Sequence, residues 1–489
     1  MDERRNDRLD RALARESGAP LRIGNRLDLL LNGPRTYEEW LKEISAAKKY
    51  VHLENYIFQN DGIGEKFAAA LSEKASEGVP VRVLYDWFGC LDVPRSFWDG
   101  MRKAGVEARA VNPPTLGSPF GATRRDHRKL LVVDGEYGST GGVCIDDGWL
   151  VTSPDSGLPY RDTAVGVRGS AVADLDRAFA EVWEQTGERL EERPSAGDIP
   201  AVGDKNVRVV IQEPSRMRIL RVLQFICAGA ERRIWIADAY FLSMPVLTQT
   251  LMSAARDGVD VRVLVPATND LPWIGVVSRT GYRQLLESGI RIFEYGGPMM
   301  HAKTTVVDGW WSRVGSTNLN VSSLTTNWEI DLVAEDEAFG AEMERTFEDD
   351  LANAREIRLE RSHRHEDRPR VQPESRIRGA DRRDRRVRRS VVGSGSGAAA
   401  TVTRVGSSAL QKSAAPLDTH ENTIAAAVGG ALLAASVLSV KFPKAIAWPI
   451  ALVAGVLGGL GVIRAARSQK PDPMSAIPPE NEEGGEIAK

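Results

Sequence analysis

The chain has 489 residues, of which 42% are hydrophobic and 27% charged, a composition typical of globular proteins with two or three domains. Its formal net charge of -3 excludes a globally basic nucleic-acid binder, although residues 355–389 hold 14 arginines against 7 acidic residues. The three cysteines, Cys90, Cys144 and Cys227, lie far apart, predict neither a disulfide framework nor a metal site, and fit a reducing compartment.

Residues 1–30 form a predicted N-terminal extension. The first 20 residues contain no apolar core, so we expect neither a signal peptide nor a membrane anchor in them.

Residues 31–355 contain an internal repeat. In each copy an amphipathic helix leads to a strand, and a second helix leads to the next strand; the predicted strands are 51–58, 79–86, 234–242 and 259–266. Strands that alternate with helices need crossover connections, so the pattern predicts an α/β fold with mostly parallel sheets flanked by helices. We therefore expect two similar lobes, over residues 31–200 and 201–355.

Each copy carries a histidine motif with the same spacing. The motif residues are His127, Lys129 and Asp134 in the first copy and His301, Lys303 and Asp308 in the second. Side chains two residues apart on a strand share a face, so each histidine projects together with its lysine. The aspartate falls on the other face, and we expect it to organise the Asp-Gly turn that ends the strand.

A histidine beside a lysine suits a phosphodiester substrate. An imidazole attacks phosphorus or moves a proton near neutral pH, and an ammonium balances the charge on the phosphoryl oxygens. Two such sets supply a two-step displacement, in which one histidine forms a phosphoenzyme and the other acts as general acid and base. This chemistry needs no metal or cofactor, so we expect none.

The residues that follow the motifs differ between the copies. The second motif continues to Ser316 and Asn318, whereas the first has Gly142 and Cys144 in their places. The first copy therefore lacks an amide that contacts phosphate, and we expect an asymmetric site.

The doubled motif resembles the phospholipase D superfamily. The sequence "HRKLLVVDG", the following "TGG" and the strand "ENYIF" are most similar to bacterial cardiolipin synthases, and the resemblance covers about residues 30 to 352. It implies two α/β lobes that meet face to face, with both motifs in one cleft. It also implies one nucleophilic histidine and one acid/base histidine, for which we expect His127 and His301 respectively.

The resemblance further implies a carboxylate downstream of each motif that orients the histidine. Asp162 and Glu329 occupy matching places in the two copies. A carboxylate bonded to one ring nitrogen fixes the tautomer of an imidazole. Solvated strand ends are the alternative interpretation of both residues.

The composition changes after residue 355. Residues 356–421 are Arg-rich and then Gly/Ser-rich, which predicts a flexible linker. Residues 422–463 contain two uncharged apolar runs, each close to the length that spans a bilayer, and predict a two-helix transmembrane hairpin. A buried hairpin in a soluble domain is the alternative. Residues 464–489 form a polar tail, and the basic residues beside the hairpin favour a cytoplasmic catalytic domain at the cell membrane.

Together these features predict a membrane-associated phosphatidyltransferase that resembles cardiolipin synthase. It would transfer a phosphatidyl group between phosphatidylglycerol molecules and release glycerol, with the Arg-rich segment either on an anionic lipid surface or simply solvated. A phospholipase D or another phosphodiester hydrolase, including a nuclease, is the alternative, because water competes with alcohols for a phosphohistidine. The acidic catalytic region argues against nucleic acid as a partner. Two intact His/Lys pairs argue against a non-catalytic scaffold, and the sequence predicts no oligomeric state.

Overall fold

A computed structural model describes residues 3–114, 124–150, 159–190, 195–242 and 244–359. The predicted hairpin and polar tail, and all but the first residues of the predicted linker, lie outside these ranges. Within them, no helix is both long enough and apolar enough to cross a membrane.

The first half of the chain builds three parallel strands and then reverses direction. The parallel strands and the helices between them are β2 (Val51–Asn55), α3 (Gly62–Ser76), β3 (Val81–Asp86), α4 (Arg95–Lys103) and β4 (Glu107–Val111). The antiparallel strands and the helix that follows them are β5 (Lys129–Val133), β6 (Tyr137–Gly141), β7 (Thr163–Arg168) and α5 (Val172–Thr186). Before them come α1 (Glu3–Ser17), β1 (Arg22–Leu31) and α2 (Asn32–Ala46).

The second half repeats this order. Its first elements are β8 (Lys205–Gln212), α6 (Arg218–Ala228), β9 (Arg233–Asp238), α7 (Pro245–Arg256), β10 (Asp260–Pro266), α8 (Pro272–Thr280), α9 (Tyr282–Glu287) and β11 (Arg291–Tyr295). The remainder are β12 (Lys303–Val307), β13 (Trp311–Gly315), α10 (Val321–Thr325), β14 (Glu329–Glu335), α11 (Glu337–Leu351) and β15 (Ala354–Ile357). The predicted repeat is therefore visible strand by strand, since β8 to β14 repeat the order of β1 to β7.

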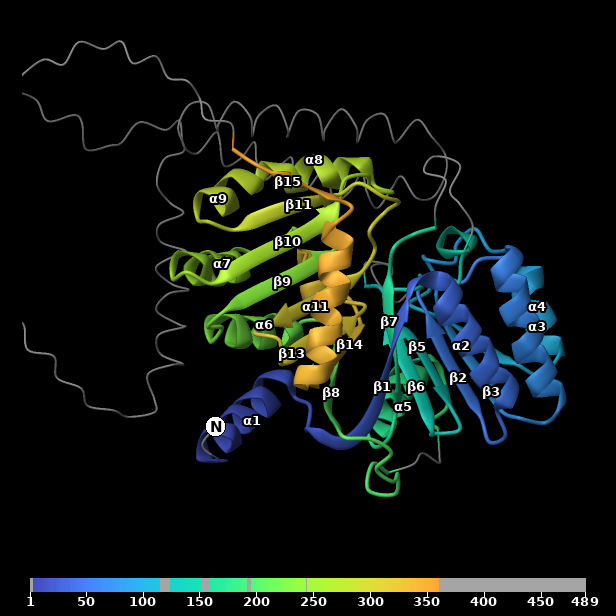
Figure 1. The fold of residues 1–489 in the computed structure, drawn as a ribbon. Coiled ribbons are helices and arrows are strands. Elements are labelled where there is room, and N and C mark those ends of the chain that lie inside the picture. The colour runs from blue at the N-terminus through green and yellow to red at the C-terminus, as the bar shows by residue number, and fades with distance from the viewer. Residues whose placement is uncertain (1–2, 115–123, 151–158, 191–194, 243, 360–489) are drawn as a thin grey trace, which may run out of the picture. The chain divides into compact units, whose positions relative to one another are not determined.

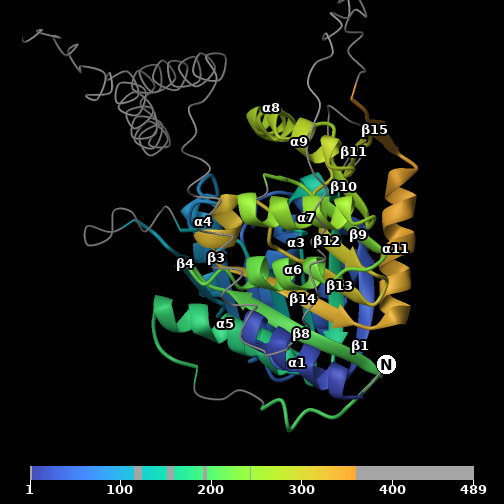
Figure 2. The same cartoon turned by 90° about the vertical axis from the view of Figure 1, so that its left-hand side faces the viewer.

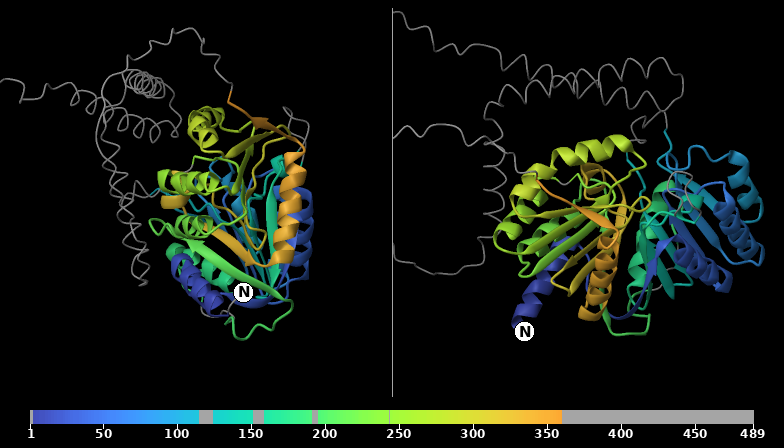
Figure 3. Two further views of the ribbon diagram at one scale, coloured as in Figure 1. Left: turned by 60° about the vertical axis from the view of Figure 1, so that its left-hand side comes forward. Right: turned by 45° about the horizontal axis from the view of Figure 1, so that its top comes forward.

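All described strands join one 15-stranded sheet, in the order β15-β11-β10-β9-β12-β13-β14-β8-β1-β7-β6-β5-β2-β3-β4. The two halves are continuous because β1 pairs with both β7 and β8. Residues 1–30, expected to be an extension, thus contribute a central strand. Helix α1 packs against α6 of the second half (Figure 3).

The prediction of mostly parallel sheets was wrong, because among the strands that the structure describes only β2-β3-β4 and β9-β10-β11 are parallel. The motif strands β5 and β12 instead begin hairpins. Asp134 and Gly135 both have positive φ, as do Asp308 and Gly309, a conformation that suits Asp-Gly in tight hairpin turns. Strands joined by such short turns run antiparallel.

Helices cover both faces of the strands in each half. Helix α11 packs on β9 and on β11 to β15 (Figure 1), whereas α6 and α7 lie on the other side of the same strands (Figure 2). In α5, apolar residues recur at helical spacing, so Leu175, Phe179 and Trp183 are all buried. They share one core with Phe339 and Met343 of α11, and this core joins the two halves.

Candidate active site

Each motif histidine is bonded to a carboxylate from the opposite half. His127 Nδ1 lies 2.9 Å from Oε2 of Glu329, and His301 Nδ1 lies 2.7 Å from Oδ2 of Asp162. All four side chains are buried. The predicted carboxylates therefore contact the predicted histidines, but the partners are exchanged between the two copies of the repeat.

Backbone bonds between the halves produce this exchange. The N–H of His127 donates to the carbonyl of Trp328 at 3.0 Å, and the N–H of His301 donates to the carbonyl of Arg161 at 2.7 Å. Because Trp328 precedes Glu329 and Arg161 precedes Asp162, each bond places a carboxylate beside the histidine of the other half. Symmetric backbone pairing thus sets the side-chain geometry.

Different donors support the two carboxylates. Ser316 Oγ donates to Glu329 Oε2 at 2.5 Å, and Asn327 Nδ2 donates to the other carboxylate oxygen at 3.2 Å. In the first half, Trp149 Nε1 donates to Asp162 Oδ2 at 2.8 Å. The tryptophan indole therefore takes the place of the serine hydroxyl.

The glycine at position 142 is required by this arrangement. A Cβ atom on Gly142 would collide with the carboxylate of Asp162. The serine of the second motif consequently has no room at the matching place in the first. Gly142 lets Asp162 pack directly against the backbone, so the departure from the second motif has a steric cause.

The two lysines lie beside the histidines, fully buried. Lys129 Nζ donates to the carbonyl of His127 at 2.6 Å, and Lys303 Nζ donates to the carbonyl of His301. Lys303 Nζ also lies 2.9 Å from Nδ1 of His301. Since a carboxylate can only accept, the proton on this Nδ1 goes to Asp162, and Nε2 keeps its lone pair.

Burial and neighbouring charges fix the ionisation of the second histidine. Burial lowers the pKa of His301 to about 3, and the Lys303 ammonium acts in the same direction against the attraction of Asp162. Burial would raise the pKa of Asp162, but His301 and Lys303 hold this pKa at about 2. At neutral pH the pair is therefore a neutral imidazole that donates to a carboxylate.

The first histidine follows the same pattern. Burial lowers the pKa of His127, opposed by Glu329 and reinforced by Lys129. Burial lowers the pKa of Lys303 to about 8, and the Lys129 ammonium contributes to the same effect. Because the lysine of each half acts on the groups of the other, both motifs belong to one electrostatic site.

The two motif aspartates lie at the far ends of their strands. The Asp134 carboxylate accepts the backbone N–H groups of residues 48, 49 and 50, at 2.7 to 2.9 Å. The Asp308 carboxylate accepts those of residues 231, 232 and 233, each at 2.8 Å. They fasten the turn after the motif strand to the start of the neighbouring strand, as the alternation of side chains predicted.

Asn318 is buried, and its Oδ1 has no hydrogen-bond partner within the described structure. Cys144, at the matching place, is fully buried. Three aromatic residues that the sequence reasoning missed surround the histidines: Tyr56 beside His127, and Trp149 and Tyr240 beside His301. Tyr56 directly follows β2, and Tyr240 lies two residues after the end of β9, so the repeat contained a signal for them.

Known proteins share this architecture. A family model described as "Cardiolipin synthase, PLD-like domain" matches residues 40–183 and 224–351. The chain is 35% identical over 319 residues to a protein of Geobacillus thermodenitrificans named cardiolipin synthase, an alignment that covers 64% of this chain and 63% of that protein. It is 32% identical over 358 residues to cardiolipin synthase A of Pseudomonas syringae pv. syringae, with 72% and 74% covered.

Among solved structures, phosphatidylserine synthase from Haemophilus influenzae Rd KW20 has a similar fold. The TM-score is 0.56 at 15% identity, and the match covers 72% of this chain and 92% of that chain. At this identity the likeness concerns the fold alone. The chain spans about 63% of the length of the Geobacillus relative.

Proposed function

The chain belongs to the PLD-like domain family described as cardiolipin synthase, and from this membership we propose that it is a phospholipid phosphatidyltransferase. Its substrate is phosphatidylglycerol, and its products are cardiolipin and glycerol. The observation that carries the proposal is the pair of buried histidines, each with a lysine beside it and a carboxylate on its Nδ1.

In the first step, Nε2 of one histidine attacks the phosphorus of phosphatidylglycerol. We assign this role to His127 and the acid/base role to His301. A new P–N bond forms while the P–O bond to the glycerol headgroup breaks. The phosphodiester anion favours the protonated form of His301, which gives its proton to the departing glycerol oxygen.

In the second step, a headgroup hydroxyl of another phosphatidylglycerol attacks the same phosphorus. His301 takes the hydroxyl proton, the P–N bond breaks, and His127 returns to its neutral form. Glu329 and Asp162 hold the Nδ1 protons and stabilise each imidazolium as it forms. Lys129 and Lys303 balance the charge on the phosphoryl oxygens, and the chemistry involves no metal or cofactor.

We further propose that residues 422–463 hold the enzyme at the cell membrane. An enzyme attached to the bilayer meets its lipid substrate at high effective concentration. Deletion of residues 420–489 is expected to shift the protein from the membrane fraction to the supernatant. If the deleted form stays fully membrane-bound, the hairpin is not the principal anchor.

The experiment that tests the function incubates the purified full-length protein with phosphatidylglycerol and identifies the products by mass spectrometry. Cardiolipin together with glycerol supports transfer, whereas phosphatidic acid indicates a phospholipase D that uses water. Lys129→Ala is expected to remove activity, and Lys49→Ala is its matched control because the Lys49 side chain is 63% exposed. Equal activity of both variants would contradict the assignment of the site.

A further inference from the structure

The surface around α8 combines exposed apolar side chains with arginines. Leu271, Val276 and Val277 are 43%, 65% and 46% exposed, whereas Ile274 of the same helix is buried. Arg279 and Arg283 follow them, with side chains 52% and 77% exposed. We refer to these five exposed residues as the α8 surface.

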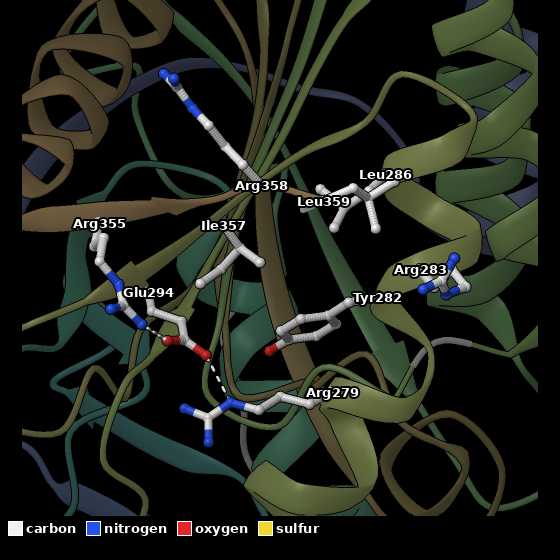
Figure 4. Close-up of a pocket in the computed structure, with 9 residues that line it drawn as sticks. All are labelled: Arg279, Tyr282, Arg283, Leu286, Glu294, Arg355, Ile357, Arg358 and Leu359. Atoms are coloured by element: carbon white, nitrogen blue, oxygen red, sulfur yellow. Dashed lines mark hydrogen bonds and ion pairs between the residues drawn. The ribbon is translucent and has the colours of Figure 1, made fainter. Parts of the chain in front are cut away.

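A pocket of about 450 Å³ adjoins the α8 surface and adds further basic groups (Figure 4). Its walls include Arg279, Arg283, Arg355 and Arg358, together with the apolar Leu359. Glu294 pairs with two of these guanidiniums, at 2.8 Å to Arg279 and 3.4 Å to Arg355. The other two arginines also pair with carboxylates, Arg283 with Glu287 at 3.3 Å and Arg358 with Glu356 at 3.0 Å. Each of the four arginine side chains is more than half exposed, and a guanidinium has five N–H donors, so these pairs leave donors for a further anion.

The α8 surface lies at the end of the sheet that carries the histidines. Helix α8 follows the carboxyl end of β10, and the neighbouring β9 ends at Asp238, which is paired with Lys303. The connection to the site is short, since the Tyr240 hydroxyl donates to Asp270 at 2.8 Å and its ring centroid lies 6.0 Å from that of His301. Two other exposed valines, Val246 and Val321, follow strands that end at this same edge.

We propose that the α8 surface docks the catalytic part of the chain onto an anionic phospholipid bilayer. The valines enter the outer part of the acyl region, and the arginines contact lipid phosphates, each strengthening binding by about fivefold. Apolar groups rimmed by cations match a bilayer whose interior is apolar and whose surface is negative. The identity of the lipid rests on the proposed function, and docking here brings the histidine edge towards the headgroups.

The test uses the full-length protein with one fluorescent label. The native cysteines Cys90, Cys144 and Cys227 are buried, so Val276→Cys supplies a selective labelling site. The control is Ile23→Cys. Ile23 is 70% exposed and lies near the start of β1, whereas Leu31 at the other end of β1 pairs with Thr163. Both labelled proteins are mixed with vesicles of phosphatidylglycerol or of phosphatidylcholine whose acyl chains carry bromine.

We expect bromine to quench the label at position 276 and not the label at position 23. The quenching at position 276 should be stronger on phosphatidylglycerol vesicles than on phosphatidylcholine vesicles. This local readout separates docking from anchoring by residues 422–463, which acts on both labels alike. Equal quenching at the two positions would overturn the proposal. So would quenching at 276 that is as strong on phosphatidylcholine.

A functional experiment completes the test. The turnover of the double variant Val276→Glu/Val277→Glu on vesicles is expected to be lower by a factor of about ten or more. Its turnover of monomeric short-chain phosphatidylglycerol should be unchanged. Equal loss on both substrates would contradict docking. Quenching needs no turnover, so a quenched label on a protein that makes no cardiolipin would refute the proposed function and leave the docking surface intact.

Discussion

Oε2 of Glu329 lies 2.9 Å from Nδ1 of His127, although 202 positions separate the two residues in the chain. The reciprocal bond joins Asp162 to His301 across 139 positions. Each half therefore supplies one imidazole and one carboxylate, and the carboxylate is bonded to the imidazole of the other half. Because of this exchange, the energetic coupling between each histidine and the carboxylate bonded to it can be measured with mutants.

A double-mutant cycle is the first prediction. Glu329→Gln is expected to lower kcat by about 10² to 10⁴, since the amide no longer stabilises the imidazolium or fixes its tautomer. In a His127→Asn background the same change should cost little further, because residues that act as a unit are not additive. The control cycle pairs Glu329→Gln with the exposed-lysine change Lys49→Ala, where the effects should add. Additive losses for Glu329 and His127 would contradict the pairing.

Covalent trapping distinguishes the two histidines. A phosphodiester with a p-nitrophenol leaving group needs no acid, so His301→Asn should release p-nitrophenol in a burst and then retain the phosphoryl group on His127. His127→Asn should show no burst. Mass spectrometry of the peptide that contains residue 127 checks the assignment, and an adduct on His301 in His127→Asn would reverse it.

Alkaline pH should weaken substrate capture. The pKa of Lys303 is lowered to about 8, so its ammonium loses its proton and its charge as the pH rises through that value. The expected result is a fall in kcat/KM above pH about 8, which reports on the free enzyme. Lys303→Arg keeps its positive charge and should move the alkaline fall in kcat/KM, the alkaline limb of the pH profile, to higher pH, even if its overall rate is lower. An unchanged limb in Lys303→Arg would assign it to another group.

Gly142→Ala should reduce activity as strongly as Asp162→Asn does, since the new methyl group displaces the Asp162 carboxylate from His301. The matched control is Gly100→Ala in α4, where a Cβ atom meets nothing within 4 Å. Steady-state kinetics on both variants checks the prediction. Gly142→Ala with wild-type kcat would show that the contact between Asp162 and His301 is dispensable.

Asp308→Ala is expected to destabilise the fold without removing the chemistry. Three backbone N–H groups lose their acceptor, at a cost of about 3 kcal/mol. Asp308→Asn should cost less, because asparagine tolerates the positive φ and keeps one acceptor oxygen. Thermal unfolding should show a Tm lowered by about 5 °C or more for alanine. Loss of turnover with an unchanged Tm would instead indicate a direct role in the reaction.

The sequence predicted the local features of the fold and not the distant ones. Side-chain alternation placed Asp134 and Asp308 away from the histidines, because strand periodicity is a property of neighbouring residues. The Asp-Gly pairs at both turns signal hairpins as well as strand ends, and a hairpin makes the motif strand antiparallel to the strand that follows it.

The exchange of carboxylates had no local signal. It depends on backbone bonds from His127 to Trp328 and from His301 to Arg161, which form only when the two halves come together. The indole donor of Trp149 was hidden for the same reason, since nothing in the repeat aligns a tryptophan with a serine. The repeat predicted the two histidines and the resemblance predicted the two carboxylates, whereas tertiary packing determines which of them bond to each other.

The reciprocal backbone bridges also bear on the ancestry of the chain. The two copies exchange the same backbone bonds, as the subunits of a symmetric homodimer do. A gene duplication that fused such a dimer would give a chain in which each histidine already bonds to a carboxylate from the other copy. A fused chain lets the two copies differ, and here Ser316 supports the carboxylate of one half, whereas Trp149 supports that of the other. Because each histidine is bonded to a carboxylate of the other half, a single substitution at Asp162 or Glu329 is expected to impair the histidine that the other copy encodes.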